Sequence, residues 1–326
     1  MSEENITIIT PTWNRAGYLP KLIDSLKSQT YKNFIWLVGN DGSTDNTDEI
    51  IRDAAKNGNI KINYFYSNVR IGKSKIDNLL LENIETDLVT WCDSDDYLLP
   101  DALENLVNLI SNIKPEDEES FVGVYGQNLD TNSVSQSYYN PEKIPYKKII
   151  NYDGWDDTVK GDGTILAFSK KFKQKKFLEV DFLITESSLL KKIFRNKKFL
   201  LSNKIVKIMD RGAENSLSFS KKLMHCKGSA FCIMEIENEE VFTKKNLFNR
   251  LKIIINYWRY CFHGEISFFE AKKKWIITKN NNFLIIFFIF SFFLILKDIC
   301  LNKVVKTHQE FNKNILKSKI NSEKFF

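Results

Sequence analysis

The fold is decided by residues 6–41, which read ITIITPTWNRAGYLPKLIDSLKSQTYKNFIWLVGND. A short β-branched, apolar run over 5–10 is typical of a buried strand. Leucine and isoleucine then recur at helical spacing over 18–29, and a second apolar run follows at 34–39. We therefore expect a strand, a helix and a second strand, which is how a doubly wound α/β sheet begins.

The same alternation continues to about residue 115. The further predicted elements are strands at 60–66 and 87–92 and helices at 43–58, 73–84 and after Pro100. The strands are apolar on both faces, as in a mostly parallel sheet that helices cover on both sides. Beyond an acidic break the pattern loosens: we predict one more strand at 121–128, short mixed elements over 165–224 and mainly helices from 247 onward.

Composition excludes several protein classes. The chain has 326 residues and is 43% hydrophobic, which is enough for a core and argues against disorder. Its five cysteines form neither a CxxC pair nor a cluster with histidine, so a disulfide framework and a zinc site are disfavoured. The first ten residues carry acids where a signal peptide needs a basic and then an apolar region, so a cytoplasmic location is expected.

A cluster of carboxylates follows the strand predicted at 87–92. The order is Asp93, Ser94, Asp95 and Asp96, and such like charges repel one another unless a cation is near. In a doubly wound sheet the carboxyl ends of the strands form the ligand-binding edge, and hard oxygen ligands select Mg²⁺ or Mn²⁺. We interpret the cluster as a metal–diphosphate site. The alternative is a helix N-terminus that acids merely stabilise.

Other candidate signals are weaker. The stretch RIGKS at 70–74 lacks the earlier glycine of a phosphate-binding loop, although Lys73 or Arg70 remains a candidate to neutralise a phosphate. No GxGxxG follows the first strand, which disfavours a dinucleotide cofactor. The three histidines are isolated in sequence and have no metal-ligand spacing.

Three segments in order resemble glycosyltransferase family 2, whose members have the GT-A fold. They are residues 6–47, the stretch NVRIGKSKIDNLL and the stretch WCDSDDYLLPDAL. The resemblance implies that the first loop and the acid after the second strand hold the nucleotide base; these residues are Thr10, Pro11, Thr12, Arg15 and Asp41. It also implies that Asp93 meets the ribose beside Ser94 and that Asp95 with Asp93 binds Mn²⁺ or Mg²⁺. As a candidate to neutralise a phosphate, Lys73 is also assigned to the nucleotide sugar.

A second stretch, residues 175–194, is similar to the acceptor region of bacterial members of this family. Glu186 takes the place of their acid, which implies a general base, although Ser187 stands where glycine or aspartate is usual. Asp157, Asp162 and Asp181 are alternative bases. The resemblance implies a GT-A domain over 1–225, with a nucleotide-binding half at 1–115 and an acceptor half at 116–225. A mainly helical, basic tail then occupies 226–326.

The implied activity is metal-dependent, inverting transfer of a sugar from a nucleotide-diphosphate sugar, such as a UDP-sugar. The acceptor would be a glycan or a lipid-linked molecule in bacterial surface polysaccharide synthesis. Because the QxxRW motif of processive enzymes is absent, one sugar is expected per encounter. Two alternatives remain open: an inactive scaffold that binds nucleotide sugar, and a nucleotidyltransferase, which needs a glycine-rich basic loop after the first strand.

The tail suggests a membrane surface as partner rather than nucleic acid. Residues 241–326 carry 16 Lys and Arg against 5 Asp and Glu, and the apolar run at 283–296 lies among these lysines. Its 14 residues would span about 21 Å as a helix, less than the roughly 30 Å of a bilayer core. We expect peripheral attachment to anionic lipid at the inner face of the cytoplasmic membrane. The alternative is a helix packed in the core.

Overall fold

The computed structural model describes residues 6–130, 148–152, 162–173, 175–180, 182–210, 225–236, 245–275, 282–301 and 320–325. The chain forms two compact units. The first comprises Met1–Lys176, Ile193–Ser218 and Asn312–Phe326, and the second comprises Phe177–Lys192 and Phe219–Phe311. The chain thus passes between the units more than once, and the predicted division at residue 225 stays a prediction.

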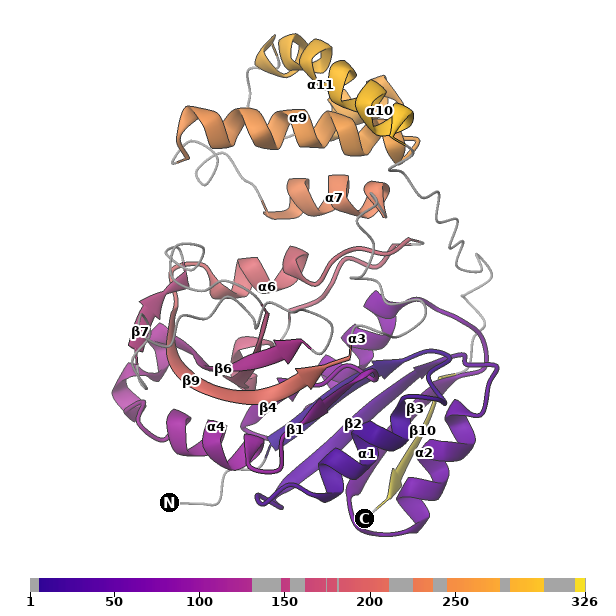
Figure 1. Ribbon diagram of the computed structural model, residues 1–326, viewed down its shortest axis with the longest axis vertical. Helices are drawn as coiled ribbons and strands as arrows, with labels where there is room; N and C mark the ends of the chain where they lie inside the picture. The colour runs from indigo at the N-terminus through magenta and orange to yellow at the C-terminus, as the bar shows by residue number, and fades with distance from the viewer. Residues whose placement is uncertain are drawn as a thin grey trace. The chain divides into compact units, whose positions relative to one another are not determined.

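Four parallel strands begin the sheet of the first unit (Figure 1). They are β1 (Ile6–Thr12), β2 (Phe34–Asp41), β3 (Lys61–Ser67) and β4 (Leu88–Trp91), in the spatial order β3-β2-β1-β4. In this register Thr12 pairs with Asn40, so the ends of β1 and β2 are level. The doubly wound arrangement expected from the sequence is confirmed here.

The sheet continues beyond β4 with mixed strand directions. The further strands are β5 (Asp96–Leu98), β6 (Phe121–Asp130), β7 (Lys148–Asn151), β8 (Gly163–Phe168) and β9 (Lys198–Met209). They extend the order as β4-β8-β6-β9-β5, and β7 pairs with β9. The β6–β9 pair is parallel and the others are antiparallel. A short 3₁₀ helix, η1 (Pro115–Ser120), leads into β6, and another, η3 (Ser169–Lys171), follows β8.

Helices cover both faces of this sheet. On one face α1 (Leu19–Lys27) and α2 (Thr47–Lys56) pack with α4 (Ala102–Ile110) over strand residues such as Trp36. On the other face lies α3 (Lys73–Glu82), and a Cβ added to Gly39 would meet its Ile76 and Leu80 side chains. Neighbouring strand residues thus alternate between two apolar layers, which is why the strands lack polar faces.

The tail departs from its prediction at its end. The structure has the expected helices α7 (Cys226–Ile236), α9 (Leu247–His263), α10 (Phe268–Lys274) and α11 (Asn282–Cys300). Residues Ile320–Phe325, however, form β10, which pairs antiparallel with β3 in the first unit. The sequence INSEKF alternates in exposure along its length, as an edge strand does, and it satisfies the backbone groups along the outer side of β3.

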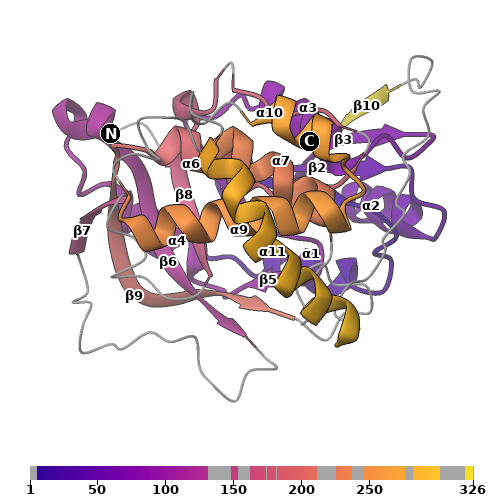
Figure 2. The ribbon, with the colours of Figure 1, turned by 90° about the horizontal axis from the view of Figure 1, so that it is seen from above.

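The second unit is built on α9. This helix packs against α7 and α11, and α10 follows it closely (Figure 2). Its core holds Tyr257, Trp258 and Trp275, with Ala230 from α7. The short α6 (Ser187–Phe194) begins in this unit. Among the described residues, no helix combines the length and the apolar character needed to cross a bilayer.

Candidate active site

Three loops meet at one edge of the sheet because β2, β1 and β4 are adjacent and parallel. Side chains join the first two loops. The amide of Asn14 donates to Ser43 Oγ at 2.9 Å, and Asn14 Oδ1 accepts from the amide of Thr44 at 2.8 Å. The amide of Arg15 donates to Thr47 Oγ1 at 2.9 Å. Asn14 has a φ of 50°, a left-handed conformation that asparagine tolerates better than most residues.

Asp41 closes the second loop onto the segment before α3. Its Oδ1 accepts from the amides of Ile71 at 2.6 Å and Gly72 at 3.0 Å, and its Oδ2 lies 3.8 Å from Arg70 Nε. Burial raises the pKa of Asp41 to about 6, although these amides and Arg70 favour its charged form. The next residue must be glycine: Gly42 has a φ of 66°, and a Cβ there would lie 2.3 Å from the Val69 carbonyl carbon.

The first loop includes three predicted site residues, Thr10, Pro11 and Thr12, which differ in burial. Thr10 is fully buried, and its hydroxyl accepts from Trp36 Nε1 at 2.9 Å and donates to the Cys92 carbonyl at 2.7 Å. It ties β1 to β2 and to the residue that follows β4, and its predicted role in holding the nucleotide stays a prediction. Pro11 is half-buried in β1. Thr12 is buried, and its hydroxyl has no hydrogen-bond partner in the described part of the chain, so it is a candidate to bond a ligand.

The acidic turn has a graded exposure. Asp93 is exposed, Ser94 is buried, Asp95 is half-buried and Asp96 is buried at the start of β5. Lys207 of β9 lies 2.7 Å from Asp96 Oδ2, and less than a tenth of its side chain is exposed. Burial alone would lower the pKa of Lys207, but the charges of Asp96 and Asp93 outweigh this and raise it. One buried cation therefore compensates part of the negative charge.

Asp95 keeps the less compensated charge of the turn. Burial raises its pKa, and the neighbouring charge of Asp96 raises it further. The positive charges of Arg15 and Lys207 act in the opposite direction. The structure thus brings Arg15 and Asp95, which are predicted site residues on different loops, within electrostatic reach of each other. An added cation beside Asp95 would relieve the remaining repulsion.

Lys73 begins α3, and its predicted place near the nucleotide sugar stays a prediction. Its ammonium lies 2.9 Å from Asp77 Oδ2, one turn along α3, and Asp77 is almost fully buried. The lysine therefore neutralises a buried carboxylate of its own helix. The guanidinium of Arg70, the other candidate on this segment, stacks on Trp13 at 3.5 Å from the ring centroid and faces Asp41.

The predicted metal ligands are Asp93 and Asp95. Within the described ranges, no three or more His, Cys, Asp or Glu side chains group as a complete protein-built metal site. Two carboxylates are nevertheless the kind of donor set that Mg²⁺ and Mn²⁺ use when substrate phosphates and water supply the other ligands. The half-buried carboxylate of Asp95, held among like charges, fits that arrangement.

The predicted general base, Glu186, is a half-buried residue directly before α6 and belongs to the second unit. Its carbonyl oxygen accepts from the amides of Leu189 and Leu190. Its catalytic role stays a prediction. Asp162 is exposed at the start of β8, whereas Asp157 and Asp181 lie outside the described residues.

Sequence reasoning missed Lys207. It lies in KIVKIM, where a lysine interrupts an apolar strand pattern with buried neighbours on both sides. A lysine in such a position needs a carboxylate partner, so this pattern was the available signal. The partner itself, Asp96, is far away in sequence and only the pairing of β5 with β9 brings them together.

Comparison with known proteins agrees with this geometry. The model of "Glycosyl transferase family 2" matches residues 7–174, about half of the chain, so the chain belongs to that family. It is 31% identical to Glycosyltransferase GlyA of Streptococcus pneumoniae over 212 residues, which are 63% of this chain and 29% of GlyA. It is 25% identical to the GalNAc(5)-diNAcBac-PP-undecaprenol beta-1,3-glucosyltransferase of Campylobacter jejuni, covering 60% of this chain and 62% of that enzyme. The match to GlyA thus spans less than a third of that relative's length.

Solved structures show the same fold. Residues 1–349 of S. aureus TarS, crystallised in complex with UDP-GlcNAc, align with a TM-score of 0.60 at 15% identity and cover 99% of each chain. At this identity the likeness concerns the fold alone. The family and the GT-A fold predicted from the sequence are confirmed.

Proposed function

We propose that this protein transfers a sugar from a nucleotide-diphosphate sugar to a glycan or lipid-linked acceptor in bacterial surface polysaccharide synthesis. The observation that carries the proposal is the acidic turn Asp93–Asp96, set beside the linked loops of β1 and β2 at the carboxyl edge of the sheet. UDP-sugars are the proposed donors, since TarS was crystallised with UDP-GlcNAc. The C. jejuni relative, named as an undecaprenol-linked glucosyltransferase, supports a lipid-linked acceptor.

The donor would be held by residues of the first unit. We assign the nucleotide to the loops around Thr12, Arg15 and Asp41, and the ribose to Asp93 with Ser94 beside it. Asp95, with Asp93, would hold Mn²⁺ or Mg²⁺ against the diphosphate. A divalent ion supplies stabilisation of the charge that develops on the departing diphosphate.

The chain's own residues have two further tasks in this proposal. Arg15 opposes the negative charge around Asp95 and so favours an anionic donor in this place. Glu186 would accept the proton of the acceptor hydroxyl as it attacks. Direct displacement by that hydroxyl inverts the sugar, and release after one transfer makes the reaction non-processive.

Asp95→Asn tests the proposal most directly. We expect it to lower UDP release from UDP-sugars by at least about 100-fold, because an amide does not replace a charged ligand near the diphosphate. UDP release would be measured with a bacterial lipid fraction as acceptor source, with Mn²⁺ and with EDTA. Asp101→Asn is the matched control, since Asp101 is exposed and asparagine is equally suited to begin α4.

Two outcomes would contradict parts of the proposal. Full activity in EDTA would exclude the metal requirement. UDP binding by calorimetry without turnover on any acceptor would favour the inactive nucleotide-sugar-binding scaffold.

We also propose that the second unit attaches the protein peripherally to anionic lipid. One face of α11 packs on α9, where Ser291 Oγ donates to the Ile255 carbonyl at 3.3 Å. The opposite face exposes a row of large apolar side chains, namely Phe292, Phe293, Leu296 and Ile299, which are 41–68% exposed. Lys297 is exposed among them. Apolar side chains with a neighbouring lysine suit the boundary between headgroups and acyl chains.

A further inference from the structure

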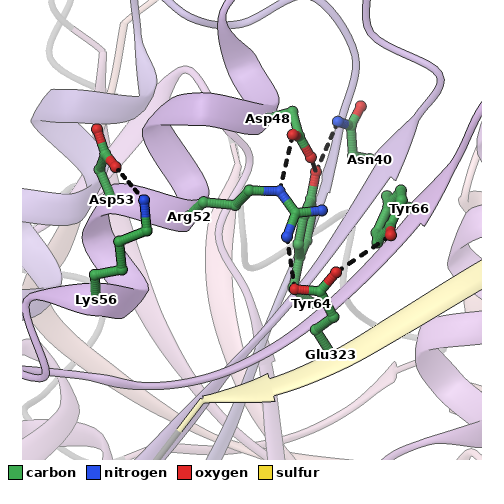
Figure 3. A network of polar contacts seen from close by, with 8 residues as sticks. All are labelled: Asn40, Asp48, Arg52, Asp53, Lys56, Tyr64, Tyr66 and Glu323. Atoms are coloured by element: carbon green, nitrogen blue, oxygen red, sulfur yellow. Dashed lines mark hydrogen bonds and ion pairs between the residues drawn. The ribbon is translucent and has the colours of Figure 1, made fainter.

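A chain of polar contacts begins at β10 and enters the first unit (Figure 3). Glu323 of β10 accepts a hydrogen bond from Arg52 Nη1 at 2.6 Å, and Arg52 Nε donates to Asp48 Oδ2 at 2.9 Å. Arg52 and Asp48 lie one turn apart on α2. The guanidinium also stacks on Tyr66, 5.0 Å from the ring centroid, and Tyr66 donates to Glu323 Oε1 at 3.2 Å. Three groups, Glu323, Asp48 and the Tyr66 ring, therefore hold the Arg52 side chain in one orientation.

The next steps have a fixed direction. The hydroxyl of Tyr64 donates its single proton to Asp48 Oδ1 at 2.7 Å. It must therefore accept from Asn40, whose Nδ2 lies 2.9 Å away. This leaves the carbonyl oxygen of Asn40 pointing to the amide of Ser43, which donates to it at 3.0 Å. The charge of Asp48 and the amide of Ser43 thus favour the same orientation of the Asn40 side-chain amide.

The chain of contacts ends in the loops of the candidate active site. Ser43 Oγ accepts from the amide of Asn14 in the first loop. Asn40 also directly precedes Asp41, which fastens the segment before α3. Tyr64 is fully buried and Asn40 is 3% exposed, so water cannot easily replace a missing partner. The orientation of Asn40 is accordingly set from inside the fold.

We propose that Tyr64, Arg52 and Glu323 are positioning residues of the donor site, and that β10 contributes to nucleotide binding through them without touching the nucleotide. When β10 pairs with β3, Glu323 fixes the orientation of Arg52, and Arg52 in turn fixes the carboxylate of Asp48. The Tyr64 hydroxyl, which bonds both Asp48 and Asn40, then fixes the side chain of Asn40 and the loop after β2. The inference rests on the proposed function only where it names a nucleotide as the ligand; the effect on the loop is independent of it.

The decisive experiment compares two isosteric variants of neighbouring tyrosines in the full chain. Tyr64→Phe removes the hydroxyl between Asp48 and Asn40, whereas Tyr66→Phe removes a hydroxyl that also meets this network but leads no further toward Asn40. We expect Tyr64→Phe to speed hydrogen exchange at the amides of Ser43 and Thr44 and to weaken UDP binding, each by about 2- to 10-fold, the worth of one hydrogen bond. Tyr66→Phe keeps the ring that stacks on Arg52 and should change both quantities far less than Tyr64→Phe does.

A second pair of variants tests the β10 end. Glu323→Gln removes the charge that Arg52 binds, and Lys324→Gln removes the next side chain on the strand, whose exposed ion pair with Glu85 is separate from the network. Glu323→Gln should change exchange and UDP affinity in the same direction as Tyr64→Phe but less, because Arg52 and Glu323 are about one-third exposed. Lys324→Gln should match the unsubstituted protein.

The readouts separate the proposal from its alternatives. A purely structural role would lower the melting temperature but leave UDP affinity, measured well below that temperature, unchanged. Unchanged exchange at Ser43 and Thr44 in Tyr64→Phe would overturn the positioning role. If the unsubstituted protein binds no UDP while Tyr64→Phe still speeds exchange, the proposed donor is wrong and the positioning of the loop stands.

Discussion

Proteins usually bury apolar side chains and expose charged ones, and two regions of this molecule depart from that rule in opposite ways. They are the acidic edge of the first unit and the outer face of α11. At the edge, charges are taken into the fold: Asp96, Lys207 and Asp41 are each less than a tenth exposed. On α11, apolar groups are left outside, and Phe293 is 68% exposed. Both departures cost stability in water, so each region is a candidate contact surface.

The two regions differ in whether their unusual side chains have partners inside the protein. Every buried charge named at the edge has a specific partner: Lys207 for Asp96 and backbone amides for Asp41. The inner face of α11 also pairs its charge, because Arg259 and His263 meet the buried Asp298. On its outer face, by contrast, Phe292 and Phe293 are 49% and 68% exposed. The buried charges of the edge are therefore paired within the protein, whereas the large apolar side chains on the outer face of α11 are exposed to solvent.

The largest expected effect comes from Lys207→Met, which tests whether the buried charge of Asp96 depends on its lysine partner. The substitution leaves Asp96 buried without its cation. We expect the free energy of unfolding to fall by about 3–5 kcal/mol, measured by urea unfolding. Lys204→Met, on the same strand and half-exposed, is the control and should lose far less. Adding Asp96→Asn to Lys207→Met should recover much of the loss. Equal losses for the two lysines would mean that the buried pair has no special weight.

This pair also marks the limit of what the sequence could predict. Asp93–Asp96 follow a strand directly, so their place at the sheet edge was predictable from local pattern and strand order. Lys207 and β10 reach their partners only through long-range pairing, with β5 and with β3. No periodicity within a short window encodes such a partner, and the same holds for the bonds of the Thr10 hydroxyl to Trp36 and to the Cys92 carbonyl. The pair of Lys73 with Asp77 is different, because its i,i+4 spacing on α3 can be read from the sequence.

A second test uses the pH dependence of Asp41. Its pKa rises from an ordinary 3.8 to about 6 on folding, so the folded state holds the proton more tightly than the unfolded state. The stability that this proton contributes is present below pH 4 and is lost as the pH rises through 6. The loss amounts to about 3 kcal/mol.

Asp41→Asn removes this dependence while keeping an oxygen to accept from Ile71 and Gly72. The variant should gain stability relative to the unsubstituted protein between pH 4.5 and 7.5 in urea unfolding without nucleotide, and it should bind UDP more weakly at pH 7.5. If the stability difference between the variant and the unsubstituted protein stays constant across this range, folding does not raise the pKa of Asp41.

The smallest expected effects concern α11, and they test whether its exposed face differs from an ordinary exposed apolar residue. Phe293→Gln should weaken flotation with anionic vesicles by about 10-fold, since burying most of a phenylalanine in lipid is worth about 1–2 kcal/mol. Ile149→Gln is the matched control: Ile149 is 58% exposed on β7 of the first unit and should not matter. Lys297→Gln should cost about 1 kcal/mol at low salt and almost nothing at high salt, because screening removes only the electrostatic part. If the unsubstituted protein stays at the bottom of the gradient, the exposed apolar side chains of α11 do not bind lipid. In that case only the acidic edge of the first unit remains a candidate contact surface.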